Sequence, residues 1–111
     1  MKVDYKDNSQ RILTAMEKGI KNGLEAIGLT AETYAKKATP VDTGRLRNSI
    51  SHSVDGEAVY IGSNVEYAPY VELGTSRAKA HHMLQKAATE HSAEYKRLAE
   101  DAVQSAINNS Q

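Results

Sequence analysis

The sequence contains no cysteine, no phenylalanine and no tryptophan among its 111 residues. Without cysteine, the chain can form neither a disulfide framework nor a thiolate metal site, and it has no thiol nucleophile. Without Phe and Trp, the six tyrosines are the only aromatic residues, so the core must be built from Ile, Leu, Val, Met and Ala. A chain of this length is one domain by size, with a thin core and a stability that is marginal without a partner.

A net charge is also absent, because 14 basic side chains balance 14 acidic ones. General nucleic-acid binders usually carry a basic excess, so the composition argues against that class, although a local basic patch remains open. No apolar run approaches the roughly 20 residues of a transmembrane helix. The segment Met1 to Asp7 is too polar for a signal peptide. We therefore expect a soluble, unexported protein that contacts no membrane.

One of the two prolines, Pro40, ends a long amphipathic segment. Spacings of three and four residues before it predict a helix over 9–38, with an apolar stripe of Ile12, Met16, Ile20, Leu24, Ile27, Ala31, Tyr34 and Ala38. At roughly 45 Å, this helix exceeds the ~13 Å radius of gyration of a compact domain of this size, so it either overhangs its domain or bends at Gly28. Gly19 and Gly23 lie one turn apart on one face of this predicted helix. They are either glycines tolerated at the surface or the site of a close contact with a helix of a second copy.

After Pro40 the pattern changes from helical spacing to alternation. Asp42, Thr43 and Gly44 supply turn chemistry, and the alternation over residues 46–54 predicts a strand. Asp55-Gly56 is a strong hairpin signal, and residues 57–62 form the return strand. Because two strands alone are marginal in water, we expect the long helix to cover the apolar face of the hairpin.

The last third of the chain predicts a short helix, a loop and a final helix. Pro69 and Gly74 bracket the short helix, residues 75–80 read as a basic loop, and helical spacing runs from Leu84 to Ala106. Residues 1–8 and 108–111 are expected to fray. The sequence thus predicts a single α+β domain over 1–111, with a long N-terminal helix, an antiparallel β-hairpin or small sheet, a short middle helix and a C-terminal helix packed on the sheet.

The polar residues assemble no recognisable catalytic or metal site. His81, His82 and His91 provide no preformed pair of metal ligands, and we interpret them as surface or interface residues. His52 alternates with apolar neighbours and reads as a packed strand residue, although a small hydrolase using His52 or His91 is a minor alternative. The serines at 49, 51 and 53 lack the Gly-x-Ser-x-Gly elbow of a nucleophile. We therefore predict a protein that is not an enzyme and has no cofactor.

Two groups of residues indicate a contact surface. Tyrosine is enriched at positions where one end of its side chain contacts apolar groups and the other end contacts water, as at interfaces. Three tyrosines cluster in the middle third of the chain. Basic residues gather in segment 77–86, which could contact an acidic protein or nucleic acid, or could simply solubilise the surface. The interface candidates are Tyr60, Tyr67, Pro69, Tyr70, Glu72, Gly74, Arg77, Lys79, His81 and His82.

Several blocks of sequence together are specific enough to indicate a family. They are Thr39 to Ile50, Tyr60 to Ser63, Tyr67 to Thr75, and the pair Met83-Leu84 that opens the last helix. In this order the blocks resemble the gp10-like minor tail components of HK-type siphophages and prophages, which are tail-completion or head-to-tail joining proteins. The resemblance covers about residues 9–107. Members typically carry a proline and a phenylalanine just before the last helix, where this chain has His81-His82-Met83-Leu84.

The resemblance implies a small α+β subunit of the phage neck or upper tail, located in the virion after assembly from the host cytoplasm. It implies a homo-oligomeric ring, sixfold to match tail symmetry, that contacts neighbouring neck or tail proteins and uses no catalytic residue, cofactor or membrane. A structural corner would consist of Asp42, Thr43, Gly44, Arg45 and Leu46. From the residues themselves, Glu66 and Glu72 read as a solvated rim or as salt-bridge partners of Arg45 rather than as an acid and base pair. We expect Arg45 to pair with Glu72. The alternative function is a DNA-contacting module of the neck that uses segment 77–86, although nucleic acid is not the favoured partner.

Overall fold

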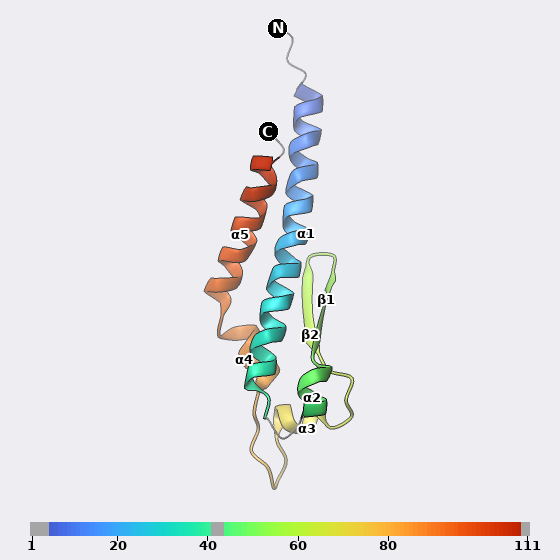
Figure 1. Cartoon of the computed structure of the whole chain (residues 1–111), viewed down its shortest axis with the longest axis vertical. Coiled ribbons are helices and arrows are strands. Elements are labelled where there is room, and N and C mark those ends of the chain that lie inside the picture. The colour runs from blue at the N-terminus through green and yellow to red at the C-terminus, as the bar shows by residue number, and fades with distance from the viewer. Residues whose placement is uncertain (1–4, 41–43, 110–111) are drawn as a thin grey trace.

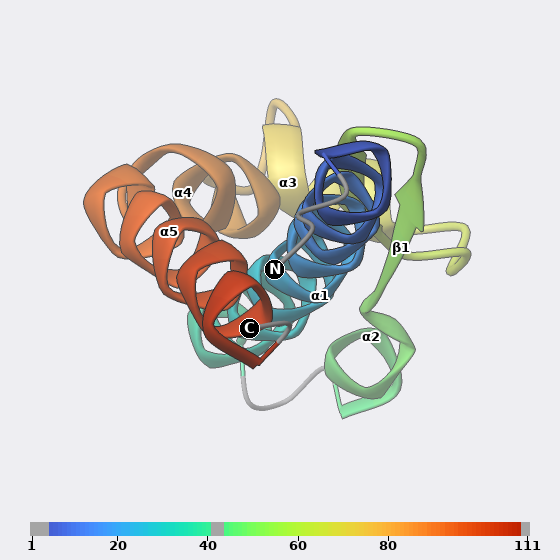
Figure 2. The ribbon, with the colours of Figure 1, turned by 90° about the horizontal axis from the view of Figure 1, so that it is seen from above.

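The computed structural model describes residues 5–40 and 44–109. The molecule is a rod of 74 × 23 × 20 Å built around one long helix (Figure 1). Seen from above, the C-terminal helices lie on one side of this helix and the hairpin on the other (Figure 2). The α+β prediction is confirmed, with elements α1 (Tyr5–Ala38), α2 (Gly44–Ser49), β1 (Ser51–Asp55), β2 (Ala58–Gly62), α3 (Ala68–Leu73), α4 (Met83–Thr89) and α5 (Ser92–Asn109).

Helix α1 is continuous, so the overhanging helix is observed and the break considered at Gly28 is not. It begins at Tyr5, inside the segment that was expected to fray, and ends at Ala38 just before Thr39-Pro40, as predicted. Gly28 has a different role, because a Cβ atom there would lie 2.5 Å from Cδ2 of His52. The glycine therefore allows β1 to approach α1 closely.

Gly19 and Gly23 seat α5 against α1, which corrects both interpretations of these glycines. A Cβ atom on Gly19 would lie 2.7 Å from the Cα atom of Val103, and one on Gly23 would lie 3.1 Å from the Cα atom of Ala99. The two backbones can approach this closely only because the side chains are missing. The close contact is within one chain. Helix α5 consequently packs on α1, whereas the sequence predicted a C-terminal helix packed on the sheet.

Residues 44–49 form helix α2, so the strand predicted over residues 46–54 is wrong in its first half. The strand β1 begins only at Ser51. Leu46 and Ile50 are both buried, whereas Asn48 between them is exposed. Two buried residues four positions apart lie on one face of a helical turn, and this spacing also fits alternation. The spacing of these buried residues is therefore compatible with a helix and with a strand. The segment forms the helix, which buries Leu46 in the core.

The hairpin forms as predicted. The strands pair antiparallel with His52 opposite Ile61 and Val54 opposite Val59. Gly56 has a φ of 60°, which is the conformation that a glycine at this place in a tight turn supplies. Both strands contact α1, which confirms that the helix covers one face of the hairpin.

The final helix is broken into α4 and α5, whereas the periodicity predicted one continuous helix. Glu90 and His91 lie between the two helices. The ring of His91 stacks on Tyr34 of α1 with 3.5 Å between centroids, and the hydroxyl of Tyr95 donates to the carbonyl of Ala87. These contacts turn the chain so that α5 runs back along α1. The stack of His91 on Tyr34 connects segments distant in sequence, so the periodicity could not reveal it.

The core consists of two small clusters at the lower end of the rod in Figure 1. Leu84 packs against both clusters and joins them. The first contains Leu46, Val65, Ala68 and Met83, and the second contains Ala35, Ile50 and Ala87. The thin aliphatic core predicted from the composition is therefore concentrated at one end, next to the loops.

Candidate functional site

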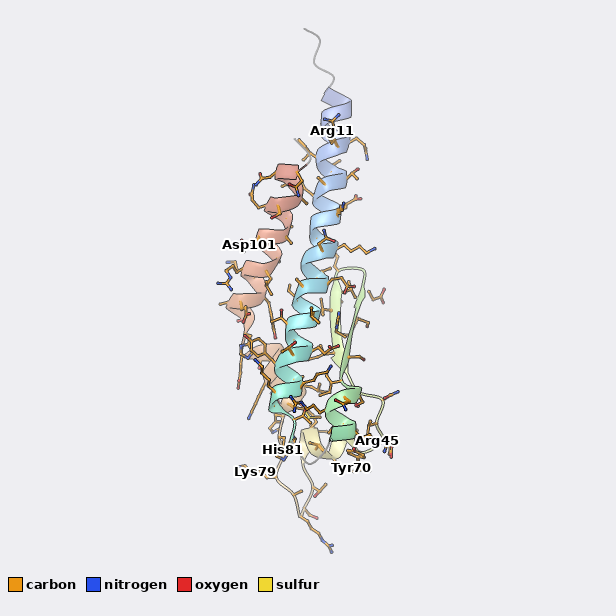
Figure 3. The ribbon with its side chains drawn as sticks, in the orientation of Figure 1. Arg11, Arg45, Tyr70, Lys79, His81 and Asp101 are labelled. Atoms are coloured by element: carbon orange, nitrogen blue, oxygen red, sulfur yellow. The ribbon has the colours of Figure 1, made fainter. Side chains whose placement is uncertain are left out.

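One end of the rod gathers Arg45 of α2, helix α3 and the loop of residues 74–82, and we call it the distal end. Figure 3 shows Arg45, Tyr70, Lys79 and His81 together there, far from Arg11 at the other end. A cavity of about 250 Å³ opens between α3 and the loop. It is lined by four of the interface candidates together with other residues: Pro40, Tyr67, Tyr70, Val71, Thr75, Ala78, Lys79 and His81.

The loop of the distal end follows a path fixed by its backbone. Gly74 ends α3 with a φ of 79°, and a Cβ atom there would lie 2.8 Å from the backbone nitrogen of Ala80. The backbone N–H of Thr75 donates to the carbonyl of Ala78 at 2.9 Å, and that of His81 donates to the carbonyl of Val71 at 2.9 Å. The loop therefore folds back over α3 and brings Lys79 and His81 beside its tyrosines.

Glu72 joins α3 to α4. Its carboxylate accepts hydrogen bonds from the backbone N–H groups of Leu84 at 2.8 Å and Gln85 at 3.0 Å. These groups belong to the first turn of α4, whose N–H groups have no partner inside the helix. A negative charge is also favourable at that end of a helix dipole. Glu72 therefore caps α4 from a neighbouring helix and does not pair with Arg45, which corrects that prediction.

Arg45 pairs with Glu66 instead. Its two terminal nitrogens lie 3.1 and 3.2 Å from the two carboxylate oxygens of Glu66, and its guanidinium lies 5.7 Å from the ring centroid of Tyr67. The pairing raises the pKa of Arg45, and the pKa of Glu66 is lowered by a backbone hydrogen bond within that residue and then by Arg45. Both side chains are largely exposed, so the pair orients groups at the distal end and adds little stability.

The other interface candidates occupy separate places. Tyr60 lies on β2, away from the cavity, with 57% of its surface exposed. Pro69 stands in the first turn of α3, as the sequence predicted. Arg77 is exposed on the loop. His82 has a φ of 51° at the start of α4, and its buried Nδ1 has no hydrogen-bond partner among the described residues.

The structural corner implied by the resemblance is only partly described. Asp42 and Thr43 lie outside the described residues. Gly44 and Arg45 open α2, and the side chain of Leu46 is fully buried in the first core cluster. The described part of the corner therefore connects the distal end to the first core cluster.

His52 makes an ionic clamp between β1 and α1 that the sequence did not reveal. Its Nδ1 lies 3.1 Å from Oε1 of Glu32 and its Nε2 lies 3.2 Å from Oε2 of Glu25. Because both ring nitrogens face carboxylates, both donate when the imidazole carries its second proton. The hydrogen bond with Glu32 is the main cause that raises the pKa of His52, and Lys36 also lies 3.3 Å from Glu32. The interpretation of His52 as a packed strand residue fits this position, and its partners on α1 could be found only in the fold.

We expect this clamp to weaken as pH rises. The pKa of folded His52 lies above 6.5, so its contribution is complete below that value and disappears as pH rises through the folded pKa. Losing a hydrogen bond between charged groups should cost about 1–2 kcal/mol. As the pH is raised from about 6 to 9, the melting temperature of the wild type should therefore fall more than that of His52→Gln. A His81→Gln control should keep the wild-type slope, and equal slopes for wild type and His52→Gln would contradict the clamp.

The N-terminal half of α1 carries an exposed apolar stripe formed by Ile12, Leu13, Met16 and Ile20, which we call the α1 stripe. These side chains are 37–53% exposed. Ile12, Met16 and Ile20 belong to the apolar stripe that the sequence identified, whereas the structure buries the neighbouring face of Ala15, Gly19 and Gly23 against α5. Large apolar residues that gather on a surface mark an interaction site more often than scattered ones do.

Within residues 5–40 and 44–109, no three histidine or acidic side chains come together as a metal site. Over the same ranges, no helix is both long and apolar enough to cross a membrane.

Comparison with known proteins gives one match. Residues 4–74 match a family model described as "Bacteriophage HK97-gp10, putative tail-component". No curated protein and no solved structure matches the chain significantly. The matched range contains α1, α2, the hairpin and α3, and it ends at Gly74, the first residue of the loop of residues 74–82.

Proposed function

Because the chain belongs to the HK97-gp10-like family of phage tail components, we propose that it completes the tail or joins it to the filled head. Membership places the protein among the structural components of the phage tail and in the virion. The proposal adds that several copies form a ring at the neck or upper tail. Such a subunit acts by its shape and its contact surfaces.

The observation that carries this proposal is the α1 stripe on a rod of 74 Å. A monomer in water keeps contiguous exposed apolar surface small, and this surface gathers on one half of a projecting helix. Burial of apolar area is the dominant favourable term in most protein association. Burial of the α1 stripe against a neighbouring tail protein would therefore provide the free energy that drives docking.

The distal end supports a second contact with a neighbouring protein. Tyr70 is largely exposed beside the cavity, and Lys79 and His81 stand at its rim. Aromatic residues are enriched in interfaces, and basic groups favour an acidic partner. A rod with one contact surface toward each end can bridge two successive layers of a tail.

The basic loop also favours a second candidate function, contact with packaged DNA. Residues 74–82 contain Arg77, Lys79 and two histidines but no acidic residue, and the loop forms the extreme lower end of the rod. A contact with phosphates should weaken steeply as salt is added. An absence of DNA binding at low salt would remove this candidate and leave the acidic protein partner.

The docking proposal can be tested with purified protein and isolated tail tubes. Electron microscopy and light scattering should show the wild-type protein at the tube end. The double variant Ile12→Asp, Ile20→Asp should fail to dock, because it places charges in the α1 stripe. Thr14→Asp is the matched control, since Thr14 is exposed on the same helix and lines the cavity between α1 and α5. Docking of the double variant at wild-type strength, or no docking of the wild type, would contradict the proposal.

A further inference from the structure

The cavity of the distal end has a largely apolar lining and a basic rim. Pro40, Tyr67 and Val71 line it as half-buried residues, whereas Lys79 and His81 line it as exposed ones. A lining that is mostly apolar, with a few polar groups that fix the orientation of the ligand, is typical of binding sites. The composition of the cavity therefore suits an apolar group that carries negative charge beside it.

The size of the cavity limits what can enter it. Its volume of about 250 Å³ lies below the roughly 300–1,000 Å³ of pockets that bind drug-sized molecules. An apolar cavity of roughly 150 Å³ is already large enough to hold one benzene ring. The cavity therefore fits a single large side chain better than a whole small molecule. The rings of Tyr67 and Tyr70 offer aromatic contacts to such a side chain.

The surface beside the cavity is also apolar. Tyr70 and Leu73 lie three positions apart on α3 and therefore share one face of that helix. These two residues are 62% and 70% exposed. Large apolar residues exposed next to a pocket are typical of a surface that a partner protein covers. A protein segment anchored in the cavity can therefore continue over this face of α3.

The positive charge of the loop is not balanced by the chain itself. Among the described residues, neither Arg77 nor Lys79 forms an ion pair. The neighbouring carboxylates already have partners, because Glu66 pairs with Arg45 and Glu72 caps α4. Complementary charges favour the correct partner and speed its encounter. The loop therefore favours a partner that brings its own carboxylates.

We propose that the cavity receives one aromatic or large aliphatic side chain from an acidic segment of a neighbouring tail protein, and that Arg77 and Lys79 pair with carboxylates next to that side chain. This inference rests on the second contact of the proposed function and names the chemistry of its occupant. Side chains that fill a pocket at the centre of an interface contribute most of the binding energy in many complexes. Packaged DNA is a different occupant, because its phosphates would use the basic loop without filling the cavity.

A short synthetic peptide tests this occupant on the purified protein. The probe is the capped pentapeptide Asp-Asp-Phe-Asp-Asp, and its binding is followed by nuclear magnetic resonance on the amide signals of the isotope-labelled protein. The largest shifts should fall on Val71, Ala78 and Lys79, which line the cavity. Replacing the phenylalanine of the probe by alanine should weaken binding roughly tenfold to hundredfold, because the cavity stays unfilled.

Filling the cavity from within the chain is the second test. Ala78 lines the cavity and is exposed on the loop, so Ala78→Leu should occupy part of the space and weaken binding of the probe roughly tenfold. Ser76→Leu is the matched control, since Ser76 is exposed on the same loop but does not line the cavity. Melting temperatures show that both variants fold, and the shifts measured on the wild type do not depend on either variant.

Reversing one charge tests the contribution of the rim. Lys79→Glu should weaken binding of the probe roughly threefold to tenfold, because it replaces an attraction by a repulsion. Lys86→Glu is the matched control, since Lys86 is exposed on α4 and does not line the cavity. Binding of the probe to the wild type should also weaken as salt is added, because salt screens exposed charges.

Three results would overturn the inference. The first is an absence of shifts at the cavity when the probe is added to the wild type. The second is equal binding of the probe and of its alanine form. The third is binding of a short DNA duplex at low salt by both the wild type and Ala78→Leu while the probe binds neither, which would favour the DNA candidate instead.

The peptide assay also separates this inference from the proposed function, because it needs no tail tubes. The double variant Ile12→Asp, Ile20→Asp keeps the cavity and should bind the probe as the wild type does, although it should not dock on tubes. If the wild type docks on tubes but the probe does not reach the cavity, only this inference is wrong. If the probe binds in the cavity and the wild type docks on no tube, the chemistry of the occupant is supported and the proposed function is wrong.

Discussion

Replacing Gly19 by leucine is expected to destabilise the protein by about 3 kcal/mol, because α5 can no longer lie against α1. Even a Cβ atom at this position would come within 2.7 Å of the backbone of Val103 and within 3.1 Å of the Cβ of Ala106. Backbone atoms cannot move aside as a flexible side chain can. The gain in helix propensity from removing a glycine, about 1 kcal/mol, is smaller than this cost.

Chemical denaturation followed by circular dichroism would measure the loss in Gly19→Leu. Lys18→Leu is the matched control, since it adds the same side chain to the same helix at an exposed position, where the change should stay within about 0.5 kcal/mol. A Gly19→Leu variant as stable as Lys18→Leu would show that α5 does not pack on this part of α1.

Replacing Leu46 by alanine should cost about 2–5 kcal/mol, the range for deleting a fully buried leucine side chain. Leu46 has 0% of its surface exposed and packs with Val65, Ala68 and Met83. Because Tyr67 and Val71 line the cavity and also pack against this cluster, the variant should also weaken any contact that uses the cavity. The effect on docking should follow the effect on stability.

Thermal unfolding would measure the first effect and binding to tail tubes the second. Leu29→Ala is the control, because Leu29 is 58% exposed on α1 and its truncation should cost well below 1 kcal/mol. Equal melting temperatures for Leu46→Ala and Leu29→Ala would contradict the assignment of Leu46 to the core.

The parts of the fold that local chemistry determines were predictable from the sequence. Pro40 ends α1, Asp55-Gly56 turns the hairpin, and Pro69 and Gly74 bracket α3. Proline fixes its own backbone, and glycine adopts the positive φ that other residues rarely take. Periodicity likewise predicted a long first helix. These signals need no information about distant segments.

The parts that depend on distant segments were not predictable in the same way. The sequence offered both Glu66 and Glu72 as salt-bridge partners of Arg45 and favoured Glu72, whereas the fold brings Glu66 to Arg45 and leaves Glu72 to cap α4. Periodicity identified the apolar residues of α1 but not which side α5 would cover, since small residues as well as large ones can form a buried face. Only the smallest residues, Gly19 and Gly23, could have indicated the close contact. They did not identify which helix packs against them.

The cavity of the distal end shares side chains with the core, and this arrangement couples ligand binding to folding. Tyr67 and Val71 line the cavity and also pack against the cluster around Leu46. Any molecule that occupies the cavity of the folded chain alone shifts the unfolding equilibrium by mass action. A thermal-shift screen can thus recognise a true partner by the rise in melting temperature that it causes, without a functional virus.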